Sequence, residues 1–213
     1  MDKVLAGQGL EKDSLDQASV AVNRALNVLK KVLPGLKTTR FHRRADFYTL
    51  VLLLHRLWDE GRTVTAHGSE RNKVAGALLT EFGAAVDRVS EKQKTMKAAT
   101  RAEKPLVQYL ATVREGTDSQ KQRQKREKIL REVIESVFDH KDPQRAFNAT
   151  QRRILWHAEK DPTCHFADCL SPRIKRWEDL HIDHVEPHVR GGKTVIANAA
   201  LAHASCNKKW GAK

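Results

Sequence analysis

Three cysteines and one histidine near the end of the chain have the spacing of metal ligands. Cys164 and Cys169 are separated by four residues, and His203 and Cys206 by two. Two such pairs suit the four positions of a tetrahedral zinc site, and thiolate and imidazole match Zn²⁺ better than Mg²⁺. These are the only cysteines in the sequence, and an odd number cannot all form disulfides. The sequence therefore predicts a structural Zn²⁺ site in a reducing compartment.

A second set of residues lies between and just after these pairs. It comprises Asp183, His184, Asn198 and Asn207. Hydrolysis of a phosphodiester needs a base for the attacking water and a cation on the phosphate. An imidazole can be neutral at cellular pH and serve as the base, while carboxylate and amide oxygens suit Mg²⁺ or Mn²⁺. Neighbours on a strand point to opposite faces, so Asp183 and His184 can share one site only where the backbone bends or at the strand's edge.

Residues 180–209 resemble the HNH nucleases. The resemblance is carried by Asp183-His184, Pro187, the Gly191-Gly192 turn, Asn198, the His203/Cys206 pair and Asn207. It implies a ββα-metal fold over residues 150–213, with a strand near residues 180–185, a second near 199–202 and a helix capped by Ser205. Zinc-bearing members often have two Cys-x2-Cys pairs, so the longer first gap and His203 are departures from the pattern.

The resemblance also implies roles for the site residues. His184 would be the general base, Asp183 and Asn207 would hold the catalytic Mg²⁺ or Mn²⁺, and Asn198 would pin the loop and orient His184. The last family position is often histidine and is Asn207 here. The implied function is a metal-dependent DNA endonuclease or nickase. Two alternatives stay open: a non-catalytic zinc-stapled DNA-binding or scaffold module, and an RNA-cleaving nuclease.

The charge of the chain also favours a nucleic-acid partner. The formal net charge is +13, which suits a polyanion. Cations that flank the predicted site or lie between predicted helices are the candidate phosphate contacts: Arg190, Lys208, Lys209, Arg43 and Arg44. A further basic cluster comprises Lys121, Arg123, Lys125, Arg126, Lys128 and Arg131. It crowds the start of a predicted helix, where it opposes the helix dipole, and this favours phosphate binding over a purely local role.

The region before the site consists of amphipathic helical patterns. Apolar residues recur every three or four positions over residues 15–33, 47–58, 74–89, 106–113 and 129–138. Ser14 with Gln17 forms a potential capping box, Ser69 a potential cap, and Pro34-Gly35 a helix stop. We therefore expect a mainly α protein: a bundle of about five helices over residues 1–140, a polar linker at 139–149, and a small zinc-stapled HNH domain at 150–213.

The helical region would position DNA, a partner protein or a second copy of the chain. It is weakly similar to the parts that precede HNH domains in effectors of bacterial restriction and anti-phage systems. The sequence lacks an apolar run long enough to span a membrane, and its first residues lack the apolar core of a secretory signal. We therefore expect a bacterial cytoplasmic protein without a membrane partner.

Overall fold

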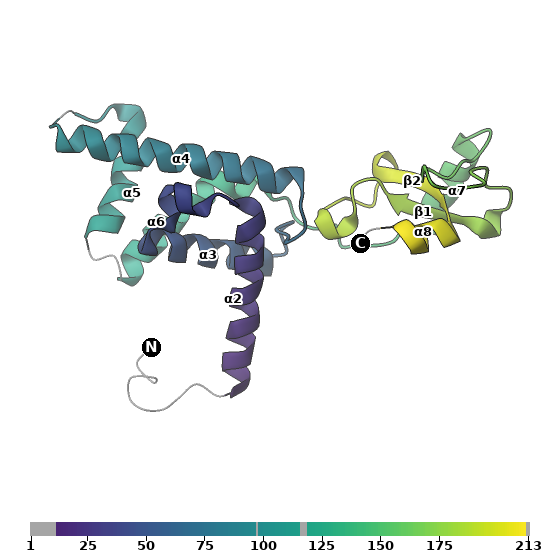
Figure 1. Ribbon diagram of the computed structural model, residues 1–213, viewed down its shortest axis with the longest axis horizontal. Helices are drawn as coiled ribbons and strands as arrows, with labels where there is room; N and C mark the ends of the chain where they lie inside the picture. The colour runs from purple at the N-terminus through teal and green to yellow at the C-terminus, as the bar shows by residue number, and fades with distance from the viewer. Residues whose placement is uncertain (1–11, 97, 116–118, 212–213) are drawn as a thin grey trace. The chain divides into compact units, whose positions relative to one another are not determined.

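The helical patterns of the first 139 residues form a bundle. The computed structural model describes residues 12–96, 98–115 and 119–211, and it divides into two compact units, Met1–Asp139 and His140–Lys213. The first unit contains α2 (Lys12–Val32), α3 (Arg44–Asp59), α4 (Glu70–Lys94), α5 (Lys104–Arg114) and α6 (Gln120–Ile134) (Figure 1). Among the described helices, none combines the length and the apolar character needed to cross a membrane. The mainly helical fold expected from the periodicity is confirmed.

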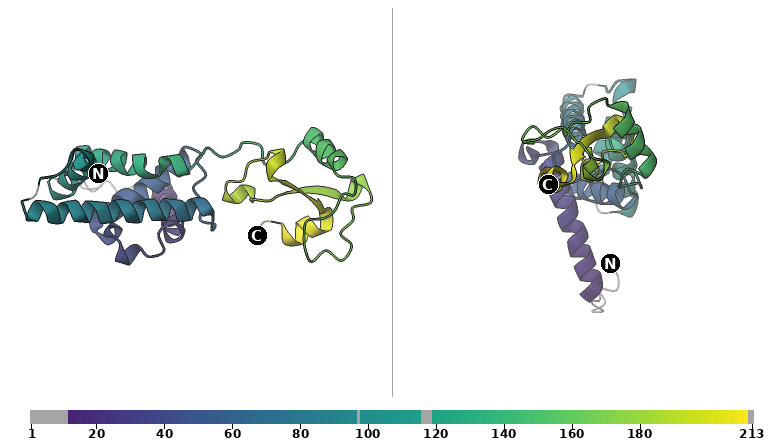
Figure 2. Two further views of the ribbon diagram at one scale, coloured as in Figure 1. Left: turned by 90° about the horizontal axis from the view of Figure 1, so that it is seen from above. Right: turned by 90° about the vertical axis from the view of Figure 1, so that its right-hand side faces the viewer.

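The ends of two helices test the predicted caps. Ser69 caps α4, where its hydroxyl accepts a hydrogen bond from the backbone N–H of Asn72. The capping box at Ser14 is wrong, because α2 already includes Lys12. Asp13 lies in the first turn of α2, where its negative charge is favourable beside the positive end of the helix dipole. This favours a helix that begins before Ser14. The side chains of residues 12–20 are exposed, and this part of α2 extends beyond the other helices of its unit (Figure 2).

The apolar pattern expected over residues 74–89 is buried in part: Val86 and Val89 belong to the core of the bundle, but the start of the pattern does not. Val74 is 49% exposed, whereas Ala75, Gly76 and Leu79 are buried. A Cβ atom on Gly76 would lie 2.1 Å from the carbonyl oxygen of Val32. The small residues thus allow α2 and α4 to approach closely, and at this point α4 buries Ala75 and Gly76 in place of Val74.

A buried polar network crosses the core of the bundle. Arg40 contacts Asp46 at 3.0 Å and Asp87 at 2.8 Å, and the Tyr109 hydroxyl donates to Asp46 at 2.5 Å. Burial raises the pKa of Asp46, while the Tyr109 hydrogen bond and nearby arginines oppose this rise. Arg40 belongs to the basic segment that contains Arg43 and Arg44, so part of that segment holds the bundle together.

The second basic cluster is also partly internal. Arg126 is 1% exposed and donates to the Thr49 hydroxyl and to the Thr112 carbonyl. Arg131 forms a two-pronged ion pair with Glu60 at 2.7 and 2.8 Å. The expectation that the whole cluster contacts phosphate is therefore wrong for these two arginines. Arg126 lies on the buried face of α6 and Arg131 is half-buried. The count of charges in the cluster could not show which side chains of this helix face the core.

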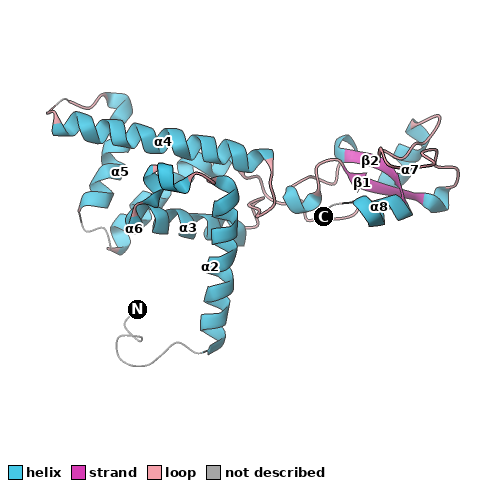
Figure 3. Cartoon of the chain, viewed as in Figure 1, coloured by secondary structure: helices cyan, strands magenta, loops and turns pink. Residues whose placement is uncertain are grey.

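The second unit is a small ββα arrangement preceded by one helix. It contains α7 (Ala149–Ala158), β1 (Leu180–His184), β2 (Ala199–His203) and α8 (Ala204–Trp210) (Figure 3). The strands are antiparallel, with Leu180 opposite His203 and His184 opposite Ala199. The expected hairpin and helix are thus present. Ser205 is not the cap, because α8 begins at Ala204 and His203 precedes it as the last residue of β2.

Candidate metal centre and active site

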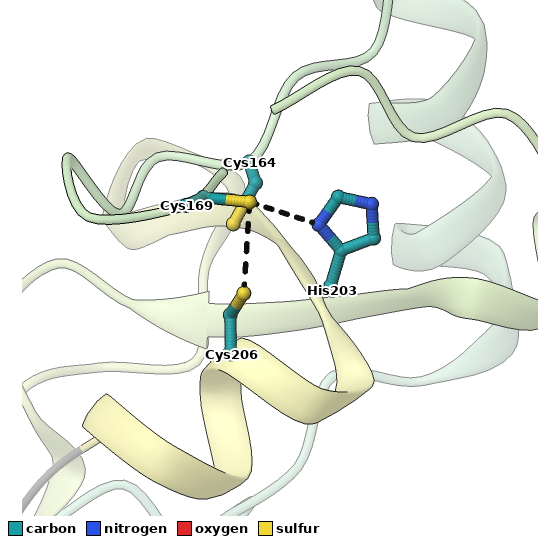
Figure 4. A group of neighbouring side chains, drawn as sticks. All are labelled: Cys164, Cys169, His203 and Cys206. Carbon is teal, nitrogen blue, oxygen red and sulfur yellow. Dashed lines mark hydrogen bonds between the residues drawn. The ribbon is translucent and has the colours of Figure 1, made fainter. Parts of the chain in front are cut away.

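The three thiols and His203 come together from three segments of the second unit. Cys164 and Cys169 lie in a loop held by a hydrogen bond from Cys164 N to Pro172 O at 2.7 Å. His203 ends β2, and Cys206 lies in the first turn of α8. One donor atom from each of the four residues lies within 4.8 Å of every other (Figure 4). Cys169 Sγ lies 3.5 Å from His203 Nδ1 and 3.7 Å from Cys206 Sγ.

This donor set fits a zinc ion. Burial raises the pKa of Cys206 to about 11, and hydrogen bonds with the thiols of Cys169 and Cys164 add to the shift. A metal cation lowers the pKa of a thiol that it coordinates and binds it as a thiolate, so a bound Zn²⁺ would offset the raised pKa of Cys206. The small core around Ile174, Leu180 and Leu201 gives a structural ion a clear role in holding the unit together.

Three of the four residues of the second predicted set line a different hollow, of about 330 Å³, and Asn198 is not among its lining residues. Its lining includes Asp183 and His184 from β1 and Asn207 from α8. His184 is the last residue of β1, where the strand gives way to a loop, and both neighbours can therefore border one space. Asn207 also donates to the backbone oxygen of Ile182 at 3.5 Å, which ties α8 to β1.

His184 is held by residues that the sequence did not single out. Its Nε2 atom lies 3.0 Å from the hydroxyl of Thr194, and its ring packs against Phe147 with 4.6 Å between centroids. Burial lowers the pKa of His184, and the neighbouring His188 lowers it further, while Asp183 and Asp142 act in the opposite direction. The imidazole is thereby favoured in its neutral form, which is the form a general base needs.

Asn198 fastens the loop that follows β1. Its side chain accepts from Glu186 N at 2.7 Å and donates to Glu186 O at 3.0 Å and to Lys193 O at 2.9 Å. A Cβ atom on Gly192 would lie 1.7 Å from Glu186 O, so the loop closes on this glycine. All three hydrogen bonds of Asn198 go to the backbone, and any effect of this residue on His184 passes through the loop.

The candidate phosphate-binding cations are distributed over both units. Lys208 is exposed on α8. The Lys209 ammonium lies 4.4 Å from the Trp210 ring, and Lys209 lines a separate hollow together with three of the metal-ligand candidates, Cys169, His203 and Cys206. Arg190 is half-buried. In the helical unit, Arg43 pairs with Asp87 at 3.0 Å, and Arg44 is the exposed first residue of α3.

Residues 140–149 belong to the site-bearing unit and are not a free linker. Asp142 accepts a hydrogen bond from Thr194 N at 2.8 Å, and the Gln144 carbonyl accepts one from the Thr194 hydroxyl. Arg145 and Phe147 line the hollow with His184. The polar composition and the proline suggested a linker, but these polar groups have partners some fifty residues away, which a local pattern cannot show.

The comparison with protein families agrees with this geometry. Residues 164–213 match a family model described as HNH endonuclease. This segment is an HNH domain. The match covers 50 of the 213 residues, starting at Cys164, so segment 140–163 lies before it. Neither the curated proteins nor the solved structures include a match. The HNH domain indicates a nuclease-type function and nucleic acid as the partner.

His165 is a further residue of the HNH domain that sequence reasoning missed. It directly follows the first metal-ligand candidate, Cys164, and its Nε2 atom lies 3.2 Å from an oxygen of Asp183. Its position in a ligand-bearing loop was the one available signal. Thr194 carried none, because an isolated threonine in a loop after Gly191-Gly192 has no chemical signature.

Proposed function

We propose that this protein is a metal-dependent HNH endonuclease that hydrolyses DNA phosphodiester bonds, one strand at a time. The observation that carries the proposal is the shared hollow of His184, Asp183 and Asn207. A base and two hard oxygen donors beside one space are the groups that phosphodiester hydrolysis requires. Cleavage of both strands would need a second copy of the chain or a second binding event by the same copy.

In this proposal His184 takes a proton from the attacking water. Its lowered pKa keeps the imidazole neutral at cellular pH. Asp183 and Asn207 would hold Mg²⁺ or Mn²⁺; when bound, such an ion neutralises charge on the phosphate and assists the departing oxygen. Exposed Arg145 at the edge of the same hollow is suited to contact a phosphate of the substrate.

A plasmid-nicking assay with Mg²⁺ tests this proposal. His184→Ala should abolish nicking while DNA binding and zinc content are retained. His157→Ala is the matched control, because His157 is exposed at the end of α7, away from the lining of the hollow. Equal behaviour of parent and His184→Ala would support the alternative, a zinc-stapled binding module without catalysis. Competition between DNA and RNA of the same sequence tests the second alternative, an RNA-cleaving nuclease.

The candidate cations predict how DNA binding responds to salt. Each phosphate contact adds about 0.9 to the slope of log affinity against log salt for duplex DNA. We expect a slope of several units, reduced by substitution of Lys208 or Arg145, which are exposed in the site-bearing unit. A role as the effector of a bacterial restriction or anti-phage system stays a prediction from the resemblance, and a cytoplasmic location stays a prediction from the number and pattern of the cysteines.

A further inference from the structure

Every polar atom of Thr194 has a hydrogen-bond partner. It is 4% exposed. Its backbone N–H donates to Asp142 Oδ2 at 2.8 Å, and its carbonyl accepts from Gln151 Nε2 at 2.8 Å. Its hydroxyl contacts two groups, the Gln144 carbonyl and His184 Nε2. A buried threonine with all its polar groups engaged is held in one orientation.

The two contacts of the Thr194 hydroxyl determine which nitrogen of His184 carries the proton. A carbonyl oxygen can only accept, so the single hydroxyl hydrogen of Thr194 is donated to Gln144. The hydroxyl can then meet His184 Nε2 only as an acceptor, and the hydrogen in that 3.0 Å contact must come from the imidazole. Neutral His184 is therefore protonated at Nε2, with its lone pair at Nδ1.

The surroundings of Nδ1 agree with a reactive role. In the described part of the chain, this atom has no hydrogen-bond partner, and it is not among the polar atoms shut off from solvent. The Phe147 ring lies against the imidazole and restricts its rotation. Because His184 lines the hollow with Asp183 and Asn207, its unprotonated nitrogen can be reached by solvent.

We propose that Thr194 is a positioning residue that sets the tautomer of His184 and thereby makes Nδ1 the nitrogen that accepts a proton. The claim that Nδ1 accepts a proton rests on the proposed nuclease function, whereas the claim that Thr194 sets the tautomer of His184 does not. Thr194 is itself oriented by Asp142, Gln144 and Gln151, which precede the matched HNH residues. A functional unit that begins at Cys164 would lack this support.

The tautomer can be measured directly on the full-length chain. Long-range ¹H–¹⁵N correlation spectra of protein labelled at histidine nitrogens distinguish Nε2–H from Nδ1–H, at a slightly alkaline pH where the imidazole is neutral. The His184 signals are assigned by their loss in His184→Asn. We expect Nε2–H in the parent and in Thr194→Ser, and a mixture of both tautomers in Thr194→Val, which keeps the shape and loses the hydroxyl.

An Nδ1–H tautomer in the parent would overturn the proposal, and so would an unchanged His184 spectrum in a folded Thr194→Val. If Thr194→Val does not fold, the parent spectrum alone decides. Nicking provides a second readout: Thr194→Val should lose roughly tenfold in rate, in part from the mixed tautomers and in larger part from the lost orientation of a base whose whole contribution is typically about 10²–10⁴-fold, and Thr194→Ser should restore it. If the tautomer result holds but the parent does not nick DNA, the nuclease function fails and the assignment of Thr194 stands.

Discussion

The Nε2 atom of His165 lies 3.2 Å from the carboxylate Oδ2 of Asp183. His165 is adjacent to the metal-ligand candidate Cys164, and its backbone N–H donates to Leu201 O at 2.9 Å. One residue thus connects the loop that bears two thiols with β2 and with the carboxylate proposed to hold the catalytic ion. The position of Asp183 therefore depends on the integrity of the loop that carries Cys164 and Cys169.

His165→Ala should reduce nicking about tenfold to a hundredfold and raise the Mg²⁺ concentration needed for half-maximal rate. The reason is that partners that orient ligating carboxylates commonly have effects of this size. The measurement is the nicking rate as a function of Mg²⁺, with the zinc content unchanged. His157→Ala, at an exposed position of α7, should behave like the parent. An unaltered Mg²⁺ dependence in His165→Ala would show that this contact does not support the site.

Cys206→Ser should release zinc and unfold the second unit while the helical unit stays folded. A structural zinc contributes on the order of 10 kcal/mol to small domains of this kind, and the apolar cluster around Ile174 and Leu201 is small. The helical unit has a separate core and should survive. Zinc per chain and limited proteolysis measure both effects, with the exposed neighbour change Ser205→Ala as the control. Retained zinc in Cys206→Ser would contradict the ligand assignment.

Gly192→Ala should destabilise the second unit by about 1–3 kcal/mol, the usual cost of forcing extra atoms into a packed position. The added Cβ would lie 1.7 Å from Glu186 O, so the loop fastened by Asn198 must move. Chemical denaturation measures the loss, and nicking should fall with it. Gly68→Ala is the control, because nothing lies within 4 Å of its added Cβ. Equal stability of the two variants would show that the loop adjusts freely.

Truncation of two neighbouring cations of α6 should affect stability in one case and leave it unchanged in the other. Arg126→Ala should cost about 2–4 kcal/mol of unfolding free energy, because it leaves the Thr112 carbonyl and the Thr49 hydroxyl without their buried donor. Lys125 is exposed, so Lys125→Ala should leave stability within about 0.5 kcal/mol. If α6 contacts nucleic acid, Lys125→Ala should also reduce the salt slope of binding by about 1. A stable Arg126→Ala would refute the structural role.

Glu103 should make the helical unit sensitive to acid. A hydrogen bond from Lys92 lowers the pKa of Glu103 to about 2, and the backbone N–H and hydroxyl of Thr100 add to this. The folded-state pKa lies below the unfolded value, so the stabilisation is present above about pH 4.5 and is lost as the pH falls toward 2. Glu103→Gln should remove this part of the pH dependence. Glu91→Gln, in the exposed pair with Lys94, is the control and should keep it.

The parts of this protein that follow local rules could be predicted from the sequence. Apolar residues three and four apart lead to helices whatever their neighbours, and the Ser69 cap needs only the next three residues. The thiols and His203 were recognisable because ligand type and spacing are themselves chemical information, and the structure brings these four donors within 4.8 Å.

Contacts between distant residues required the tertiary structure. Polar residues at 142–144 resembled a linker until Thr194 was found bonded to them, and the positive charge of Arg126 suggested phosphate binding until its side chain was found inside the bundle.

The sequence by itself determined which groups are available: three thiols, an Asp-His pair, two asparagines and five amphipathic helices. Only the tertiary structure decided that the Thr194 hydroxyl lies 3.0 Å from His184 Nε2 and that His165 contacts Asp183. Ligand chemistry belongs to a side chain, but the protonated nitrogen of an imidazole depends on which partner lies within 3 Å, and folding brings that partner from another part of the chain.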